Sequence, residues 1–357
     1  MSLTVLSVAY PLAPVSADAA GGAEQVLSAL DRGLVAAGHR SIVIAQAGSR
    51  TAGELVEVEP APGSLDDAAV ASARARHRAA IASVLARRPV ELVHLHGIDF
   101  HTYLPAPGVP VLATLHLPPS WYPNAIWTLS RPDTFFNCVS EAQACACPTS
   151  PHLIEPIPNG VDVEGLQARH AKRDFALFIG RICPEKGVHL AIEAAKRAGV
   201  ALLIAGEVFP YPEHRRYFDE EVRPRLDCRR RYIGPVGFAR KRRLLTAARC
   251  VLIPSLAPET SSLVAREAAA CGTPAVAFPN GALADAVEHG GTGFLVEDVS
   301  AMADAIHGCR SVDPALCRGV ARSRFGQAEM VARYLELYGR LAGSDRRGGR
   351  LPMASAS

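Results

Sequence analysis

The stretch LTVLSVAYPLAPVSADAAGGAEQVLSALDRGLVAAGHRSIVIAQA, residues 3–47, decides the fold. Its apolar run at 3–9 predicts a buried strand, and after Gly21 and Gly22 the apolar residues recur at helical spacing. Residues 41–47 are again continuously apolar, which predicts a second buried strand. The order strand, loop, helix, strand is typical of a parallel sheet with helices on both faces.

The same alternation continues, and it restarts after the polar stretch 165–174. Further strands are expected at 91–96, 109–116, 134–139, 175–180, 200–206, 250–255, 273–278 and 293–298, and helices at about 66–88, 186–198, 240–248, 262–271, 300–309 and 313–343. We therefore predict an α/β protein of two Rossmann-like domains, each built on a parallel sheet. Two such sheets that face each other form a cleft at the carboxyl ends of their strands, where ligands bind.

The expected domain limits follow from this pattern. The first domain is assigned to 1–168 and the second to 169–325, with a C-terminal helix at about 326–343 that packs back on the first domain. The polar end of the sequence, 344–357, is expected to be a disordered tail.

Composition excludes several classes of protein. The 357 residues suffice for about two domains, and 49% hydrophobic with 20% charged residues describes an ordinary globular chain rather than a disordered or fibrous one. A formal net charge of +3 gives no reason to expect a nucleic-acid partner. Residues 3–9 faintly resemble a signal peptide, but no Lys or Arg precedes them, so a first strand explains them better. The uncharged stretch 102–130 contains six prolines and is not expected to span a membrane.

The nine cysteines are odd in number and form no CxxC pair, which favours a reducing, cytoplasmic location. Cys145 and Cys147, with His152 nearby, have poor spacing for structural zinc, so no metal site is assigned.

Two loops after predicted strands carry residues suited to an anionic ligand. Gly21 and Gly22 would let the backbone and the start of a helix approach a ligand, although a tight turn explains them as well. Gly180-Arg181 and Lys186 place two cations after a strand, as a diphosphate would require, although surface cations are commoner.

The most informative segment is PSLAPETSSLVAREAAACGTPAVAF, residues 254–278. Glu259 lies in a loop and Glu267, eight residues later, lies in a helix that begins near Ser262. The first amides of that helix, at 262–264, would face an anion, and the carboxylates would accept hydrogen bonds from sugar hydroxyls.

This segment resembles the E-x7-E signature of the retaining glycosyltransferases of family 4, which have the GT-B fold. The resemblance extends to GGAEQVLSALDRGLVAAGH (21–39), TLH (114–116), PNGVD (158–162), GRICPEKG (180–187), GPVGF (234–238) and NGALADAVEHGGTGFLVE (280–297). The motifs occur in the family's order and cover most of the chain to about residue 343.

The resemblance implies a role for each matching residue. Arg181 and Lys186 hold the donor diphosphate, Glu259 lies near the donor sugar, and His116 contacts that sugar. The remaining donor-binding positions that it implies are Gly21, Gly22, Gly180, Val236, Gly237, Ser262, Leu263, Val264 and Glu267, the last of which takes the ribose hydroxyls. Without the resemblance, His116 is most simply a structural histidine, as His94 and His96 are expected to be.

One departure concerns the residues after Glu259. The family commonly has an aromatic residue and a glycine there, whereas this chain has Thr260-Ser261-Ser262. Assigning the missing glycine to Ser261 predicts an altered donor geometry and makes Ser261→Gly the informative variant.

The acceptor side is less specified. Trp121 and Tyr122, with Trp127 further on, either stack on an acceptor or pack their own loop. Segment 210–243 carries eleven Lys and Arg against five acids, which suits weak peripheral contact with a membrane or a lipid diphosphate, or simply a solvated helix face.

These observations predict a cytoplasmic, metal-independent, retaining transferase of carbohydrate biosynthesis. It would move a hexose from a nucleotide diphosphate sugar, UDP-sugar first and GDP-mannose second, to the hydroxyl of a sugar, lipid-linked or small-molecule acceptor. Fixed cations that stabilise the leaving diphosphate make a metal unnecessary, and the nearest approach to a D-x-D motif is Asp162-Val-Glu164. The alternatives are a nucleotide-sugar-binding relative without turnover and a GT-B epimerase.

Overall fold

The computed structural model describes residues 2–60 and 65–344. The chain divides into two compact units, unit 1 (1–158 and 329–357) and unit 2 (159–328). The first boundary therefore lies ten residues before the expected residue 168, because Val161, Val163 and Leu166 pack into the core of unit 2. Apart from Ser344, the predicted tail lies outside the described residues.

Unit 1 is built on a six-stranded parallel sheet in the order β3-β2-β1-β4-β5-β6. Its strands are β1 (Thr4–Val8), β2 (Arg40–Gln46), β3 (Glu54–Val58), β4 (Leu92–Leu95), β5 (Val111–Leu115) and β6 (Thr134–Cys138). Its helices are α1 (Gly22–Ala36), α2 (Asp67–Arg87), α3 (Glu141–Cys145) and most of α12 (Gln327–Ser344), with short turns η1 (Phe100–Thr102), η2 (Pro119–Trp121) and η3 (Asn124–Thr128).

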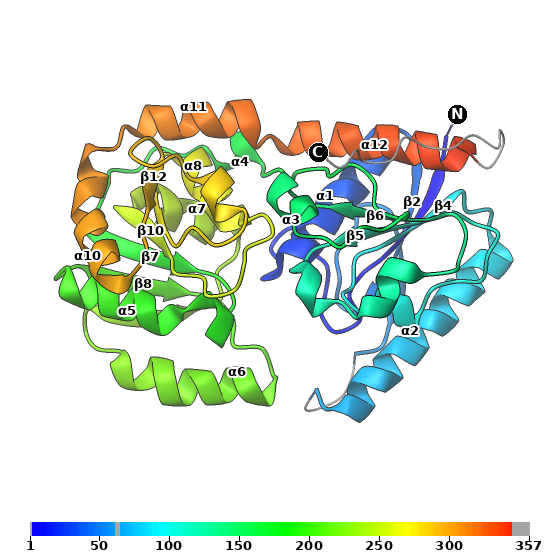
Figure 1. Ribbon diagram of the computed structural model, residues 1–357, viewed down its shortest axis with the longest axis horizontal. Helices are drawn as coiled ribbons and strands as arrows, with labels where there is room; N and C mark the ends of the chain where they lie inside the picture. Colours follow the sequence, from blue (N-terminus) through cyan, green and yellow to red (C-terminus); the bar gives the residue numbers. More distant parts are fainter. Residues whose placement is uncertain (1, 61–64, 345–357) are drawn as a thin grey trace. The chain divides into compact units, whose positions relative to one another are not determined.

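Alternate residues of the strands in unit 1 face opposite helices. Val93 and Leu95 of β4 share a core cluster with Ile81 of α2, whereas His94 between them bonds Tyr338 of α12. Helix α12, near the end of the chain, thus packs on a sheet that is built from the first 140 residues of the chain (Figure 1).

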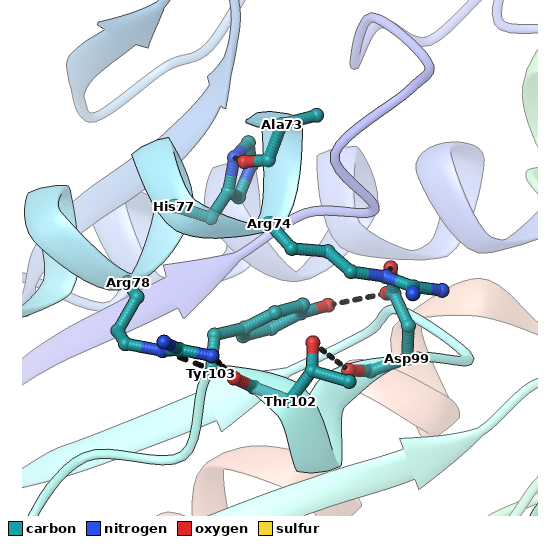
Figure 2. Close-up of polar contacts among 7 residues, drawn as sticks. All are labelled: Ala73, Arg74, His77, Arg78, Asp99, Thr102 and Tyr103. Carbon is teal, nitrogen blue, oxygen red and sulfur yellow. Dashed lines mark hydrogen bonds and ion pairs between the residues drawn. The ribbon is translucent and has the colours of Figure 1, made fainter. Parts of the chain in front are cut away.

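A buried carboxylate fixes the loop that follows β4 (Figure 2). Asp99 is 2% exposed, and its carboxylate accepts hydrogen bonds from Arg74 Nε of α2 at 2.7 Å and from the Tyr103 hydroxyl at 2.9 Å. Arg78, one turn further along α2, donates to the Thr102 carbonyl. These contacts tie α2 to the carboxyl end of the sheet.

Unit 2 repeats the architecture with the order β12-β11-β10-β7-β8-β9. Its strands are β7 (Phe175–Ile179), β8 (Ala201–Ala205), β9 (Arg230–Gly234), β10 (Cys250–Ile253), β11 (Ala275–Ala277) and β12 (Gly293–Leu295). Its helices are α4 (Val163–Leu166), α5 (Val188–Arg197), α6 (Pro212–Tyr217), α7 (Phe238–Ala247), α8 (Leu263–Ala270), α9 (Leu283–Ala286), α10 (Val299–Gly308) and α11 (Pro314–Arg324), with turns η4 (Pro184–Lys186), η5 (Phe218–Val222), η6 (Arg223–Arg225) and η7 (Cys309–Ser311).

Two core clusters cover the two faces of this sheet. Helices α5 and α10 pack on one face, and α7, α8 and α11 on the other (Figure 1). The predicted α/β class and paired Rossmann-like sheets are confirmed. The edge strands β3 and β9 were not predicted, because Glu54, Glu57, Arg230 and Arg231 interrupt their apolar runs.

Within the described residues, no helix combines the length and apolar character that crossing a bilayer requires.

Candidate active site

The loops after two neighbouring strands of unit 2 bring together three predicted site residues. β7 and β10 are parallel neighbours, so the loops that follow them leave the same edge of the sheet. Arg181 and Lys186 follow β7, and Glu259 follows β10. The Lys186 ammonium donates to Glu259 Oε1 at 2.5 Å.

Glu259 is held by more than this cation. The hydroxyl of Ser255, 1% exposed, donates to the same carboxylate oxygen at 2.5 Å. Burial raises the pKa of Glu259, but the charge and hydrogen bond of Lys186, the Ser255 hydroxyl and the charge of Arg181 together lower it below its ordinary value of 4.5. Glu259 is therefore an ionised acceptor for a hydroxyl, with a cation bound to it.

Backbone contacts fix the three loops that follow β7, β10 and β11. The Leu256 amide donates to the Glu185 carbonyl at 2.8 Å, and the Ala282 amide donates to the Glu259 carbonyl at 2.7 Å. Gly187 has a φ of 62°, and a side chain there would meet the carbonyl oxygen of Pro254. Helix α5 therefore begins at Val188, and Lys186 lies in the turn η4 rather than in the helix expected from 186.

The predicted start of α8 is confirmed within one residue, since the helix runs over Leu263–Ala270 with Ser262 as its N-cap. The amides of Leu263 and Val264 lie in its first turn, where backbone donors have no partner within the helix. Ser262 has φ 51° and ψ 73°, the left-handed region that favours glycine.

This geometry corrects the position of the missing glycine. The non-glycine residues with positive φ in the described chain are Asp133 and Ser262, so Ser261 has ordinary backbone. Ser261 is instead 3% exposed, with a hydroxyl that has no hydrogen-bond partner. The informative substitution is therefore Ser262→Gly, not Ser261→Gly.

Glu267, the predicted ribose-binding acid, lies on α8 and is 5% exposed. It accepts from Lys241 Nζ of α7 at 2.5 Å, and Lys241 is itself only 8% exposed. Lys241 was not predicted as a site residue, because it stands in the basic run RKRR (240–243). The available signal was that Lys241 precedes Leu244 by three residues and Leu245 by four. This spacing places Lys241 on the inner face of α7.

The remaining donor-side positions lie at the same edge of the sheet in unit 2. Gly180 directly follows β7, and Val236 and Gly237 connect β9 to α7, with Gly237 as the N-cap of that helix. Asp162 caps α4 through the Gly165 amide, and Glu164 lies 3.8 Å from Arg322, so this acidic pair already has partners.

In unit 1, Gly21 and Gly22 begin α1, with Gly21 as an N-cap that has no capping side chain. A side chain at Gly21 would meet the carboxylate of Glu24, which is 7% exposed and folds back over the turn. The absence of a side chain at Gly21 therefore leaves room for the Glu24 carboxylate of the same helix.

His116 directly follows β5 and belongs to a histidine cluster. Its Nε2 lies 3.0 Å from Nδ1 of His96, and the two rings are stacked. Burial lowers the pKa of His116 to about 3, so the pair is neutral at physiological pH. His96 Nε2 is buried without a partner, and because an unpartnered lone pair costs less than an unpartnered N–H, we assign the shared proton to His96 Nδ1.

The predicted acceptor residues differ in exposure. Trp121 is 38% exposed, whereas Tyr122 is 4% and Trp127 is 5% exposed. The Tyr122 hydroxyl accepts from the Leu117 amide at 3.3 Å and so holds the loop after His116. Tyr122 thus packs its own loop, and Trp121 alone presents a surface.

Two further sequence features have ordinary contacts. Both ring nitrogens of His152 face carbonyl oxygens, of Thr134 at 2.9 Å and Leu129 at 2.8 Å, so this histidine is not available as a ligand beside Cys145. In segment 210–243, Arg223, Arg225 and Arg230 pair with Asp219, Glu221 and Asp227, which supports the solvated-face interpretation.

The two units define the class of protein. Each is built on a Rossmann-like sheet, and unit 2 places the Lys186–Glu259 pair beside the start of α8. This combination is that of a GT-B glycosyltransferase. The sequence family described as Glycosyltransferase Family 4 matches residues 20–164, and the family described as Glycosyl transferases group 1 matches 173–310. The chain belongs to these glycosyltransferases.

Relatives and solved structures agree with this assignment. The chain is 34% identical over 176 residues to D-inositol 3-phosphate glycosyltransferase of Mycobacterium avium (44% of this chain, 41% of that protein) and 32% identical over 245 residues to glycogen synthase of Mycobacterium tuberculosis (60% and 58%). It thus spans about half the length of these curated relatives.

The crystal structure of AviGT4, a glycosyltransferase involved in avilamycin A biosynthesis, has a TM-score of 0.71 at 27% identity (96% of this chain, 98% of that one). Anabaena HepE in complex with UDP-glucose has a TM-score of 0.72 at 18% identity (95% and 100%).

Proposed function

We propose that the chain transfers a hexosyl group from a nucleotide diphosphate sugar, with UDP-sugar favoured and GDP-mannose second, to an acceptor hydroxyl with retention of configuration. The observation that carries this proposal is the Lys186–Glu259 pair beside Arg181, at the edge where α8 presents its first amides. The neighbour that binds UDP-glucose, and the names of the curated relatives, support a sugar nucleotide as donor.

The chemistry explains why these groups suit the reaction. When the bond between the anomeric carbon and the diphosphate oxygen breaks, negative charge grows on the diphosphate, and the cations Arg181 and Lys186 stabilise it. The acceptor oxygen bonds to the anomeric carbon on the same face, and its proton passes to the departing phosphate oxygen. Two fixed cations and the amides of α8 supply the charge stabilisation, so the proposed transfer requires no metal.

The ionised Glu259 is then free to bind a sugar hydroxyl rather than to act as a nucleophile. Glu267 would accept the ribose hydroxyls through the oxygen atom that Lys241 does not occupy. His116, after β5, would contact the donor sugar, and the acceptor would bind through unit 1, where Trp121 lies further along the same loop. The free thiols of all nine cysteines support a reducing, cytoplasmic location.

A metal-free thermal-shift screen tests the donor. Purified protein is heated with UDP, GDP, ADP and their sugar conjugates without added metal, and a ligand at many times its dissociation constant should raise the unfolding temperature. We expect a selective shift with one base. No shift with any nucleotide would contradict the proposal.

Turnover separates transfer from the two alternatives. With the donor that shifts the unfolding temperature, we expect sugar transfer to an acceptor and an anomeric configuration that NMR shows to be retained. Isomerisation of the donor without an acceptor would instead identify an epimerase, and binding without consumption of the donor would identify a binding protein.

A further inference from the structure

We propose that unit 2 contains a zinc-binding site formed by Cys183, Glu185 and His214. Cys183 is the N-cap of η4, Glu185 lies within η4, and His214 lies on α6. One ligand atom from each, a thiol sulfur, a carboxylate oxygen and a ring nitrogen, lies within 4.8 Å of the other two. The site lies outside the predicted donor contacts, and its evidence does not depend on the proposed function.

The donor set matches the chemistry of Zn²⁺, which binds cysteine sulfur, histidine nitrogen and carboxylate oxygen. With Zn–S of about 2.3 Å and Zn–N and Zn–O of about 2.0–2.2 Å, tetrahedral ligands lie roughly 3.3–3.7 Å apart. Ligand atoms that lie within 4.8 Å of one another therefore need to approach by at most about 1.1–1.5 Å. Three protein ligands leave the fourth position for water.

A second and independent observation is that two buried polar atoms of this cluster have no hydrogen-bond partner among the described residues. They are Glu185 Oε2 and His214 Nδ1, and His214 is only 8% exposed. Leaving such atoms unpaired is unfavourable, so they mark a place where a ligand is expected. The rings of Phe209 and Tyr211 pack edge-on against the His214 ring.

Charge also favours a divalent cation here. A thiolate, a carboxylate and a neutral imidazole carry two negative charges, which Zn²⁺ neutralises. Zn²⁺ binding would displace the thiol proton of Cys183, so the occupied site would carry no net charge close to Arg181, two residues before Cys183.

The site would cross-link two separate segments. Cys183 and Glu185 belong to the loop that carries Arg181 and Lys186, while His214 belongs to α6, which continues into η5 beside α5 (Figure 1). Zinc bound there would hold the loop that bears the two cations against α6.

The test uses the full chain with the two exposed cysteines and the half-buried Cys147 replaced (Cys145→Ser, Cys147→Ser, Cys228→Ser), so that these thiols do not bind metal. After treatment with a chelator and gel filtration, one equivalent of Zn²⁺ alone is added and retained metal is measured. We expect one equivalent to remain bound, a higher unfolding temperature, and a thiolate-to-metal charge-transfer band when Co²⁺ replaces Zn²⁺. No retained metal, or no thiolate band, would overturn the proposal.

Variants assign the ligands. Cys183→Ser should abolish the charge-transfer band, and His214→Gln should weaken Zn²⁺ binding at least tenfold, whereas the exposed histidine variant His170→Gln should match the parent. If Cys183→Ser does not fold, Glu185→Gln and His214→Gln, with folding checked by circular dichroism, decide the matter. Unchanged metal affinity in both would refute the site.

Discussion

Lys186 and Glu259 stand 73 positions apart in the sequence, yet the ammonium of one donates to the carboxylate of the other at 2.5 Å. Their side chains are 26% and 11% exposed, so the pair is partly withdrawn from water. Neighbouring parallel strands β7 and β10 create this contact, since each residue lies in the loop after its strand.

Replacing the cation tests its role in catalysis. Lys186→Met should reduce transfer with the donor identified above by about 100-fold or more, because one fixed group that stabilises the leaving charge is typically worth that much. The measurement is the rate of donor consumption at saturating donor and acceptor. Lys196→Met, an exposed lysine on α5 of the same unit, is the control and should retain full activity. Equal rates in the two variants would contradict the assigned role.

The pair also predicts a pH dependence of stability. The pKa of Glu259 is below its ordinary value of 4.5, so the unfolded chain binds this proton first as the pH falls. The ionised carboxylate therefore contributes stability above pH 4.5 and loses it as the pH falls towards the folded value. We expect the parent to be more stable than Glu259→Gln by about 1–3 kcal/mol at pH 7, with a smaller difference below pH 4.5. Urea titrations from pH 3.5 to 7 check this, and a difference that does not change with pH would refute it.

Ser262 predicts an unusual response to glycine. A non-glycine residue in the left-handed region costs roughly 1–2 kcal/mol, and glycine relieves that cost while adding about 0.5–1 kcal/mol of unfolded-state entropy. We expect Ser262→Gly to be neutral or stabilising by up to about 1 kcal/mol. The neighbouring Ser261→Gly, which has no positive φ to relieve, should destabilise by about 1 kcal/mol. Chemical denaturation measures the free energy of unfolding of both variants. If Ser262→Gly were less stable than Ser261→Gly, the left-handed conformation of residue 262 would carry no strain.

His94 within β4, and His96 and His116 directly after β4 and β5, predict an acid-sensitive unit 1. Burial lowers the pKa of His116 from 6.5 to about 3, and burial also lowers the pKa values of His94 and His96. Below pH 6.5 the unfolded chain therefore binds protons that the folded chain does not, so the free energy of unfolding should fall as the pH decreases from 6.5. The NMR signal of the His116 ring, assigned with His116→Asn, should not titrate between pH 5 and 8. A midpoint within that range would contradict this prediction.

Tyr338 predicts how firmly α12 is attached. It is fully buried, and its hydroxyl lies 2.8 Å from Nδ1 of His94. Tyr338→Phe leaves that nitrogen buried without its partner, which should cost about 1–3 kcal/mol. The control Arg340→Ala, also on α12, removes an exposed ion pair with Glu155 and should cost less than about 1 kcal/mol. Equal costs would show that the hydroxyl contributes nothing specific.

Apolar periodicity was enough to predict the interior of both sheets. Strands such as β10 and β11 are buried on both faces and therefore have uninterrupted apolar sequences. The edge strand β9 pairs with β8 alone, so charged residues are tolerated and the pattern disappears.

The candidate site could be predicted only in part. Residues in loops after strands, such as Lys186 and Glu259, follow from the rule that ligands bind at carboxyl ends. The pairing of Lys241 with Glu267 could not be predicted in this way, because it depends on how α7 packs against α8. The burial of Tyr122 likewise depends on tertiary packing in a loop without periodicity.

The arrangement of the chain in unit 1 has a consequence for biosynthesis. Unit 2 is one continuous segment, 159–328, and so has all its strands once that segment has left the ribosome. Unit 1 requires residues from 329 onward to supply the hydroxyls that His94 and Asn137 contact. Synthesis of unit 1 therefore begins first, but the unit is completed last. Until α12 has been made, the face of the sheet at β4–β6 that carries these polar groups is exposed to solvent or to chaperones.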